Sequence, residues 1–116
     1  MIYTASMNFD DYQKKAMTTA ITSGSGLPVL ATRSLGLGGE AGEVQELIKK
    51  AIRDNEGVLP DEKLPALKKE LGDVLWYVAA IADFYDLSMQ DIAKTNIDKL
   101  CSRKKRGTLS GSGNDR

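Results

Sequence analysis

Apolar side chains recur at the three- and four-residue spacing of amphipathic helices along most of this 116-residue chain. The pattern predicts four helices, and no run of residues alternates as a half-buried strand does. The predicted helices span approximately residues 8–21, 32–54, 61–85 and 88–105. Short connections between long amphipathic helices favour an all-α fold, and we expect a four-helix bundle.

Glycine, proline and capping residues mark where these helices begin and end. Asn8 or Asp10 is expected to cap the first helix, and Ser88 is expected to cap the fourth. Pro65 is compatible with the third helix because it lies in or near the first turn. The apolar residues 27–31 are compatible with a short extended segment, but a single such piece has no strand to pair with.

From residue 74 onward the third helix, VLWYVAAIADFY, is apolar on almost every side. A bundle of four helices cannot easily bury such a helix unless a second copy of the chain covers it. We therefore expect at least a homodimer, with Trp76, Ala80 and Phe84 as interface candidates. The alternative is a core helix in a compact monomer.

Two of the predicted helices each carry a pair of acidic residues beside the apolar face. Glu40 and Glu43 form the first pair, and Glu70 and Asp73 form the second. Three positions on a helix correspond to about 60° of rotation and one turn of rise, so the carboxylates of each pair can converge on one point. If the two helices pack antiparallel, the four carboxylates face one another.

Such a cluster is destabilising unless a cation neutralises it. Two like charges about 4 Å apart repel by roughly 4 kcal/mol at an effective dielectric of about 20. Oxygen ligands that are mostly carboxylates suit Mg²⁺ or Mn²⁺. Acids three residues apart are also common on solvated helix faces. However, each pair here encloses a glycine, Gly42 or Gly72, that costs about 1 kcal/mol relative to alanine in a helix and leaves space beside the carboxylates.

Composition narrows the possible chemistry. The chain has no histidine and one cysteine, Cys101, which excludes His-based triads, structural zinc sites and an internal disulfide. Sixteen basic and sixteen acidic residues leave no net charge to attract nucleic acid or anionic lipid. No segment reaches the roughly 18 apolar residues of a membrane span, and the N-terminus lacks the pattern of a signal peptide. We therefore expect a cytoplasmic protein.

The fourth helix places polar residues where core residues are expected. Asn96, Lys99 and Arg103 project to the same side as Ile92 and Leu100. A phosphate-bearing ligand above the acids would give these polar groups partners. The alternative is a helix end that protrudes into water. The final residues, GTLSGSGNDR, have the composition of a flexible tail, although their amides and hydroxyls could also wrap phosphate oxygens. We therefore divide the chain into a helical domain, residues 1–106, and a flexible or substrate-covering tail, residues 107–116.

The motif EAGE, followed after 26 residues by ELGD and later by NIDKLCSRKKRG, resembles the all-alpha nucleoside triphosphate pyrophosphohydrolases, the MazG-like group related to dimeric dUTPases. The resemblance covers approximately residues 35–106. The closing tail is similar to that of small single-domain members encoded by phages and mobile gene cassettes. The resemblance implies a helical bundle that forms a dimer or a dimer of dimers. It also implies Mg²⁺ on the carboxylates and hydrolysis of a nucleoside triphosphate to the monophosphate and pyrophosphate.

The resemblance also implies residue roles, by position. The metal ligands would be Glu40, Glu43, Glu70 and Asp73, with Glu40 or Glu43 as the catalytic base. Asn96 and Lys99 would contact phosphates, and Tyr77 would approach the sugar or base. The phosphate or base contacts would be completed by Arg103, Arg106 and Arg116.

Two other interpretations remain at this point, and two more are disfavoured. The enzyme could be a narrower dUTP or dCTP diphosphatase, or the chain could be a non-catalytic nucleotide-binding helical module. A di-iron carboxylate bundle normally requires Glu-x-x-His, which this chain lacks. The loose dinucleotide-binding pattern at Gly36, Gly38 and Ala41 has no strand before it and is weak.

Overall fold

The computed structural model describes residues 6–116, and within this range it contains helices and no strand. The predicted all-α fold with four α-helices is therefore confirmed. Residues 1–5 of the predicted helical domain lie outside the described range. The elements are α1 (Phe9–Met17), α2 (Leu27–Asn55), the short 3₁₀-helix η1 (Asp61–Lys63), α3 (Leu64–Phe84) and α4 (Met89–Arg106). None of the helices in the described range is long and apolar enough to cross a bilayer.

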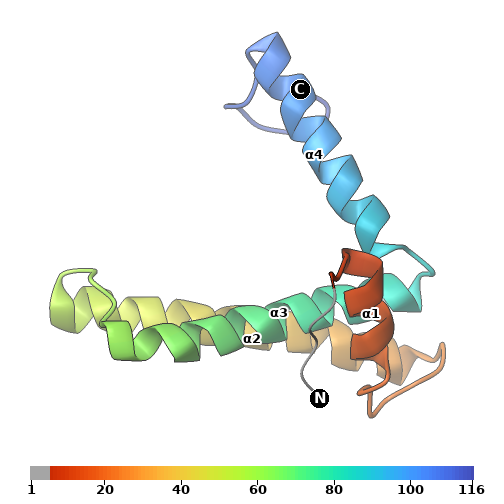
Figure 1. The fold of residues 1–116 in the computed structure, drawn as a ribbon, viewed down its shortest axis with the longest axis horizontal. Helices are drawn as coiled ribbons and strands as arrows, with labels where there is room; N and C mark the ends of the chain where they lie inside the picture. Colours follow the sequence, from red (N-terminus) through yellow and green to blue (C-terminus); the bar gives the residue numbers. More distant parts are fainter. Residues whose placement is uncertain (1–5) are drawn as a thin grey trace.

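The two longest helices, α2 and α3, lie side by side as an antiparallel pair (Figure 1). Their connection includes the left-handed residues Glu56 and Gly57, with Gly57 at a φ of 85°, and η1 then leads into α3. The antiparallel arrangement on which convergence of the two acid pairs depends is therefore present.

Helix α1 crosses α3 and also holds the connection to α4 (Figure 1). The Gln13 side-chain amide donates to the carbonyl oxygens of Ala79 and Leu87, and its oxygen accepts from the Met89 amide. Buried Ala79, Ala82 and Met89 form the core beneath this crossing. The core therefore lies at the junction of α1, α3 and the start of α4.

A second tie between α1 and α4 is made by Asp10. Its carboxylate accepts hydrogen bonds from the Gln90 amide at 3.0 Å and from the Ser88 hydroxyl at 2.8 Å. These bonds, the one from Gln90 first, lower the pKa of Asp10 because they favour the charged carboxylate. Ser88 also caps α4 by accepting from the Asp91 amide, which confirms the predicted N-cap.

Beyond this junction α4 extends away from the α2–α3 pair (Figure 1). Its main helix contacts are with α1. A single chain therefore does not close α4 along the α2–α3 pair, and several large apolar side chains stay exposed. Examples are Ile48 at 45%, Ile52 at 63%, Leu71 at 51% and Ile97 at 57%.

Three boundaries differ from the predicted ones. Helix α3 begins at Leu64 rather than near residue 61, because residues 61–63 form η1. Helix α1 ends at Met17 rather than near Ile21, and the hydroxyls of Thr18 and Thr19 donate to the Lys15 and Ala16 carbonyls of its last turn. Helix α2 begins at Leu27, five residues earlier than predicted, with Pro28 in its first turn. The extended interpretation of residues 27–31 is therefore wrong, because proline at that position lacks only an amide that a helix start leaves unpaired.

The interface candidates on α3 need one correction. Ala80 is fully buried within the chain, so it is not available to a second copy. Trp76 is half-buried, and its indole N–H donates to the Thr19 hydroxyl and to the Ala16 carbonyl. The end of α1 and the residues that follow it cover part of the face that the sequence suggested was free.

Candidate functional site

Acidic residues from the two paired helices converge as predicted. Glu40 of α2 and Glu70 and Asp73 of α3 each offer a carboxylate oxygen, and these oxygens all lie within 4.8 Å of one another. Glu40 and Glu70 are half-buried, whereas Asp73 is exposed. The i, i+3 spacing on α3 and the antiparallel packing against α2 together bring the three groups to one point.

Glu43, the fourth predicted ligand, lies outside this group of three. Its side chain is exposed, one turn further along α2 than Glu40. Its charge still raises the pKa of Glu40, although it is the smallest of the causes. The geometry therefore supplies three convergent carboxylates rather than four.

The electrostatics of the group indicate an unsatisfied negative charge. Burial is the largest cause of the raised pKa of Glu40, followed by the charges of Asp73 and Glu70 and a side-chain hydrogen bond with Glu70. Among the ion pairs within residues 6–116, none includes any of these three acids. Three carboxylates without a cationic partner form a donor set that fits an oxygen-preferring divalent cation such as Mg²⁺.

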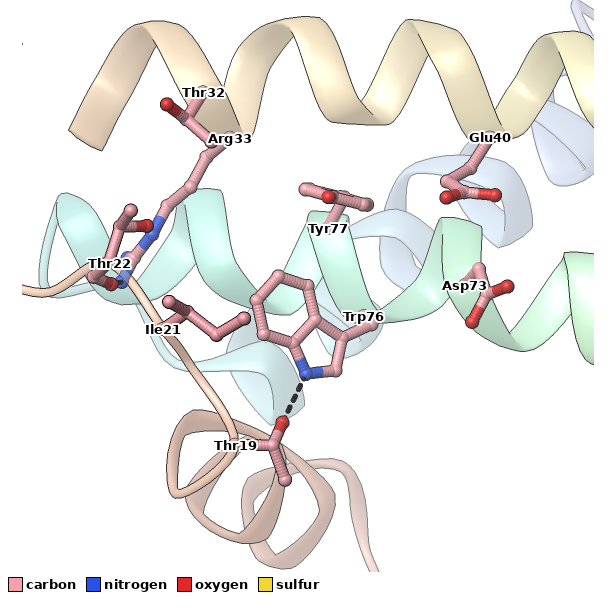
Figure 2. Close-up of a pocket in the computed structure, with 9 residues that line it drawn as sticks. All are labelled: Thr19, Ile21, Thr22, Thr32, Arg33, Glu40, Asp73, Trp76 and Tyr77. Atoms are coloured by element: carbon pink, nitrogen blue, oxygen red, sulfur yellow. Dashed lines mark hydrogen bonds between the residues drawn. The ribbon is translucent and has the colours of Figure 1, made fainter. Parts of the chain in front are cut away.

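A pocket of about 500 Å³ adjoins the acids (Figure 2). Glu40 and Asp73 lie at one end, and the loop between α1 and α2 lies at the other. Two adjacent aromatic side chains of α3 form much of the surface between the ends, with ring centroids 5.0 Å apart in an edge-to-face arrangement. The pocket is lined by Thr19, Ile21, Thr22, Thr32, Arg33, Glu40, Asp73, Trp76 and Tyr77.

Tyr77, predicted to approach the sugar or base, lines this pocket beside the acids. Its ring packs directly on Gly36 of α2: a Cβ atom at that position would lie 2.1 Å from Tyr77 Cε1. Gly36 is therefore required for the close approach of the ring. In contrast, a Cβ at Gly42 or Gly72 would meet no atom of the described chain within 4 Å, so both glycines face open space.

Two residues near the acids or the adjoining pocket were not predicted from the sequence. Tyr12 of α1 has a raised pKa, mainly because it is partly buried and also because Asp73 is near. Arg33 of α2 is 4% exposed and lines the pocket. The Arg33 guanidinium donates to the Ala80 and Thr22 carbonyl oxygens. The only sequence signal for Arg33 was that this charged residue falls on the apolar side of its helix.

The predicted phosphate contacts on α4 do not reach the acids within one chain. Asn96 is exposed and Lys99 is half-buried, and both line a shallow cavity on α4 itself. The acid-side pocket contains no residue of α4 among the described residues. This separation follows from the direction in which α4 leaves the paired helices (Figure 1).

The three arginines predicted to contact phosphate or base donate instead to main-chain oxygens of the C-terminal tail. Arg103 is 4% exposed, and its guanidinium donates to the carbonyl oxygens of Gly113 and Asn114. Arg106 donates to the carbonyl oxygen of Arg116, whose own guanidinium donates to main-chain oxygens of residues 108, 109 and 113. The tail therefore folds back against the end of α4 in the structure.

Comparison with known proteins gives two matches. The family model of the MazG nucleotide pyrophosphohydrolase domain matches residues 31–108. The Gene 37 protein of Mycobacterium phage L5 is 43% identical over 114 residues, which cover 95% of this chain and 100% of that protein. No solved structure matches the chain significantly. The matched range begins within α2 and ends just after α4, and it contains the three convergent acids.

Proposed function

Because the chain belongs to the family of MazG nucleotide pyrophosphohydrolase domains, we propose that it is an Mg²⁺-dependent nucleoside triphosphate pyrophosphohydrolase. The proposed reaction converts a ribo- or deoxyribonucleoside triphosphate into the monophosphate and pyrophosphate. The observation that carries the proposal is the convergence of Glu40, Glu70 and Asp73 from two paired helices. A cytoplasmic role in removing unwanted nucleotides or adjusting a nucleotide pool follows from the family.

The proposed cation site consists of Glu40, Glu70 and Asp73, with Glu43 as the candidate for a fourth ligand. When bound there, Mg²⁺ offsets the negative charge of the phosphates and lowers the pKa of the attacking water, and Mn²⁺ is an alternative with the same ligand preference. Without a cation the same three carboxylates would repel a triphosphate, so we expect activity to require the metal.

The chain's own residues supply the proton acceptor. Water attacks the α-phosphorus, the bond from that phosphorus to the α,β-bridging oxygen breaks, and pyrophosphate leaves with that oxygen. The chain has no histidine, so a carboxylate accepts the proton from water, and Glu40 and Glu43 are the candidates.

The remaining contacts come from the pocket and from α4. Tyr77 lies in the pocket beside the acids and is proposed to contact the sugar or base. Asn96 and Lys99, together with the arginines at the end of α4 and in the tail, are proposed to contact phosphates. These residues lie away from the acids in one chain, so α4 of a second copy brings them to the site in this proposal.

A homodimer, or a pair of such dimers, is consistent with the exposed apolar surface of a single chain. Among the described residues no large side chain is fully buried, and the buried hydrophobic residues are mostly alanine. A second copy packed on the α2–α3 pair would bury the exposed Ile48, Ile52 and Leu71. The same contact would complete the site with basic residues.

Product analysis tests the proposed function. The protein is incubated with a panel of ribo- and deoxyribonucleoside triphosphates, in Mg²⁺ and separately in EDTA, and the products are separated. Monophosphate and pyrophosphate in equal amounts, only with metal, are the expected result. Turnover of a single pyrimidine triphosphate would identify a dUTP or dCTP diphosphatase. Release of diphosphate and phosphate, or nucleotide binding without turnover, would contradict the proposal.

A further inference from the structure

The loop between α1 and α2, residues 18–26, carries an exposed apolar side chain that the proposed reaction does not yet use. Resting on the proposed function, we infer that this loop forms the wall that receives the nucleobase. In this proposal, Ile21 and Trp76 are the contact surfaces for the base. Arg33 is the positioning residue that holds the loop in place.

Ile21 is 99% exposed although it lines the pocket together with Trp76 (Figure 2). A single exposed isoleucine needs no explanation elsewhere on a surface. Here, however, its side chain and the half-buried indole line the same pocket beside each other. A flat apolar group bound in the pocket against both side chains would bury both surfaces.

The indole of Trp76 is fixed in orientation. Its N–H donates to the Thr19 hydroxyl at 2.9 Å and to the Ala16 carbonyl at 3.2 Å. Ala16 belongs to the last turn of α1, and Thr19 lies just after that helix. With the polar edge of the ring held there, the apolar part of the ring is left to the pocket (Figure 2). The ring is therefore organised before a ligand arrives, which reduces the entropy lost on binding.

Arg33 holds the other side of the loop. Its guanidinium donates to the Thr22 carbonyl at 3.2 Å and to the Ala80 carbonyl at 2.6 Å, and it lies 3.4 Å from the Asp83 carboxylate. Thr22 directly follows Ile21, and Thr19 precedes it by two residues. Ile21 therefore stands between two tethers, one to Trp76 and one to the buried Arg33.

The position of the acids determines which ligand the pocket fits. Glu40 and Asp73 line one end, where a metal-bound phosphate chain would lie, Ile21 lines the far end, and Trp76 lies between them. A ligand that contacts both ends carries phosphates at one end and a planar, weakly polar group at the other. A nucleotide has this chemistry, whereas inorganic tripolyphosphate has only the first part.

The test uses Trp76, which is the only tryptophan of the chain and therefore the only source of tryptophan fluorescence. The full-length protein with Mg²⁺ is titrated with α,β-imido nucleoside triphosphates of the common bases, which resist cleavage at the α,β bond, and with inorganic tripolyphosphate. We expect saturable quenching by the nucleotides and little change with tripolyphosphate. Equal fluorescence changes with both kinds of ligand would overturn the inference.

Ile21→Ala tests the contact surface. We expect nucleotide affinity to fall roughly tenfold, because most of one apolar surface is lost, while tripolyphosphate affinity, measured by calorimetry, stays unchanged. Val58→Ala is the matched control, since Val58 is 63% exposed in the connection between α2 and η1 and does not line the pocket. Unchanged nucleotide affinity in Ile21→Ala would overturn the inference. Equal losses in the two variants would do the same.

Arg33→Lys tests the positioning role, because lysine keeps the charge but lacks the planar fork that reaches two carbonyls. We expect KM to rise about tenfold with kcat nearly unchanged, and discrimination among bases to weaken. Arg53→Lys is the control, because Arg53 pairs with Asp54 on the exposed end of α2. A fall in kcat with KM and base preference unchanged would overturn the role.

If Arg33→Lys fails to fold, Thr19→Val tests the same loop from its exposed side, because it removes the nearer of the two Trp76 acceptors with little change in volume. The expected result is again weaker nucleotide binding with tripolyphosphate binding retained, and unchanged nucleotide binding would count against the inference. Because binding is measured without turnover, absence of hydrolysis would contradict only the proposed function. Hydrolysis without nucleotide-specific quenching of Trp76 fluorescence would contradict only this inference.

Discussion

The acidic and basic residues expected to form one site lie in two regions that are organised differently. On the α2–α3 pair, Glu40, Glu70 and Asp73 converge within a single chain. On α4, Asn96 and Lys99 lie on a helix that leaves this pair, and the basic last turn faces the folded tail (Figure 1). The comparison teaches that a single chain brings the three acids together by itself, whereas the residues proposed to bind phosphate remain apart from them.

The physical reason lies in what holds each region. The paired helices share a long contact, so residues at helical spacing on both are fixed relative to each other. Helix α4 is attached mainly at its first turn, through Asp10 and Gln13 of α1. A helix attached at one end leaves the rest of its length for another partner, and in the proposal that partner is a second copy.

The largest effect is expected from the acidic region. Glu70→Gln keeps the shape of the side chain but removes a charge from the cluster, so turnover should fall on the order of 10³-fold. Pyrophosphate release measures the loss, and circular dichroism checks that the helices remain. Glu46→Gln is the control, because Glu46 pairs with Lys49 and Lys50 on the exposed side of α2. Similar activity in the two variants would remove the acidic cluster from the mechanism.

A smaller effect is expected from the basic region. Lys99→Ala should lower kcat/KM by about 10- to 100-fold, because one charge-assisted phosphate contact is lost. Lys94→Ala on the same helix is the control, since Lys94 pairs with Asp98 at 2.7 Å. Steady-state kinetics with the best triphosphate gives both values. If Lys94→Ala is as damaging as Lys99→Ala, the effect belongs to the net charge of α4 rather than to a substrate contact.

Removing residues 108–116 tests whether the folded tail belongs to the site. Truncation frees Arg103 and Arg106 from the tail carbonyls. If the tail covers bound substrate, KM should rise several-fold with the helical content unchanged. Asp115→Asn keeps the tail at full length and serves as the control. An unchanged KM would show that the tail is dispensable, as its glycine- and serine-rich composition alone suggests.

The stability of the acidic cluster should also depend on pH. Glu40 has a pKa raised above its ordinary value of 4.5, so the native state binds this proton more tightly than the unfolded chain does. The repulsion between the Glu40 carboxylate and the neighbouring acids is therefore present above the raised pKa of Glu40, and it is relieved as the pH falls through that pKa. In EDTA, the melting temperature of the wild type relative to Glu40→Gln should rise as the pH falls from neutral toward the raised pKa. A difference that does not change with pH would contradict this, and Mg²⁺ should reduce the difference.

The smallest effect is expected at the junction. Asp10 has a pKa lowered from its ordinary value of 3.8, so its contribution is present above that value and is lost as the pH falls through the lowered pKa. Asp10→Asn should lower the melting temperature at neutral pH by a few degrees, since the carboxylate accepts from Ser88 and Gln90. Asp61→Asn in η1 is the control. Equal melting temperatures for Asp10→Asn and the wild type would show that this tie does not stabilise α4.

Much of this fold was predictable because local patterns determine it. The helical spacing of apolar residues predicted all four helices. Residue type alone predicted Asn8 or Asp10 as the first cap and Ser88 as the cap of α4, and the caps are Asn8 and Ser88. The early start of α2 was missed because glycines and the apolar residues around Pro28 weaken the amphipathic pattern there. The direction of α4 was also missed, because it depends on hydrogen bonds between residues about 80 positions apart.

The site residues also divide into those that the sequence could predict and those that it could not. Convergence of Glu40 with Glu70 and Asp73 follows from helical spacing and antiparallel packing, both of which sequence can indicate. The position of Arg33 does not follow from such a pattern, because its partners lie in a loop and near the end of α3, 47 positions away. The pocket wall around Ile21 is likewise created by tertiary contacts.

The central claim, that acids of one chain act with basic residues of another, is tested most directly by complementation. Glu70→Gln and Lys99→Ala chains carrying different affinity tags are coexpressed, and the mixed dimer is purified through both tags. If each site combines the acids of one copy with α4 of its partner, one of the two sites is intact, and the mixed dimer should show about half of wild-type turnover. Turnover no higher than the average of the two mutant homodimers would contradict the claim and place both groups of residues within one chain.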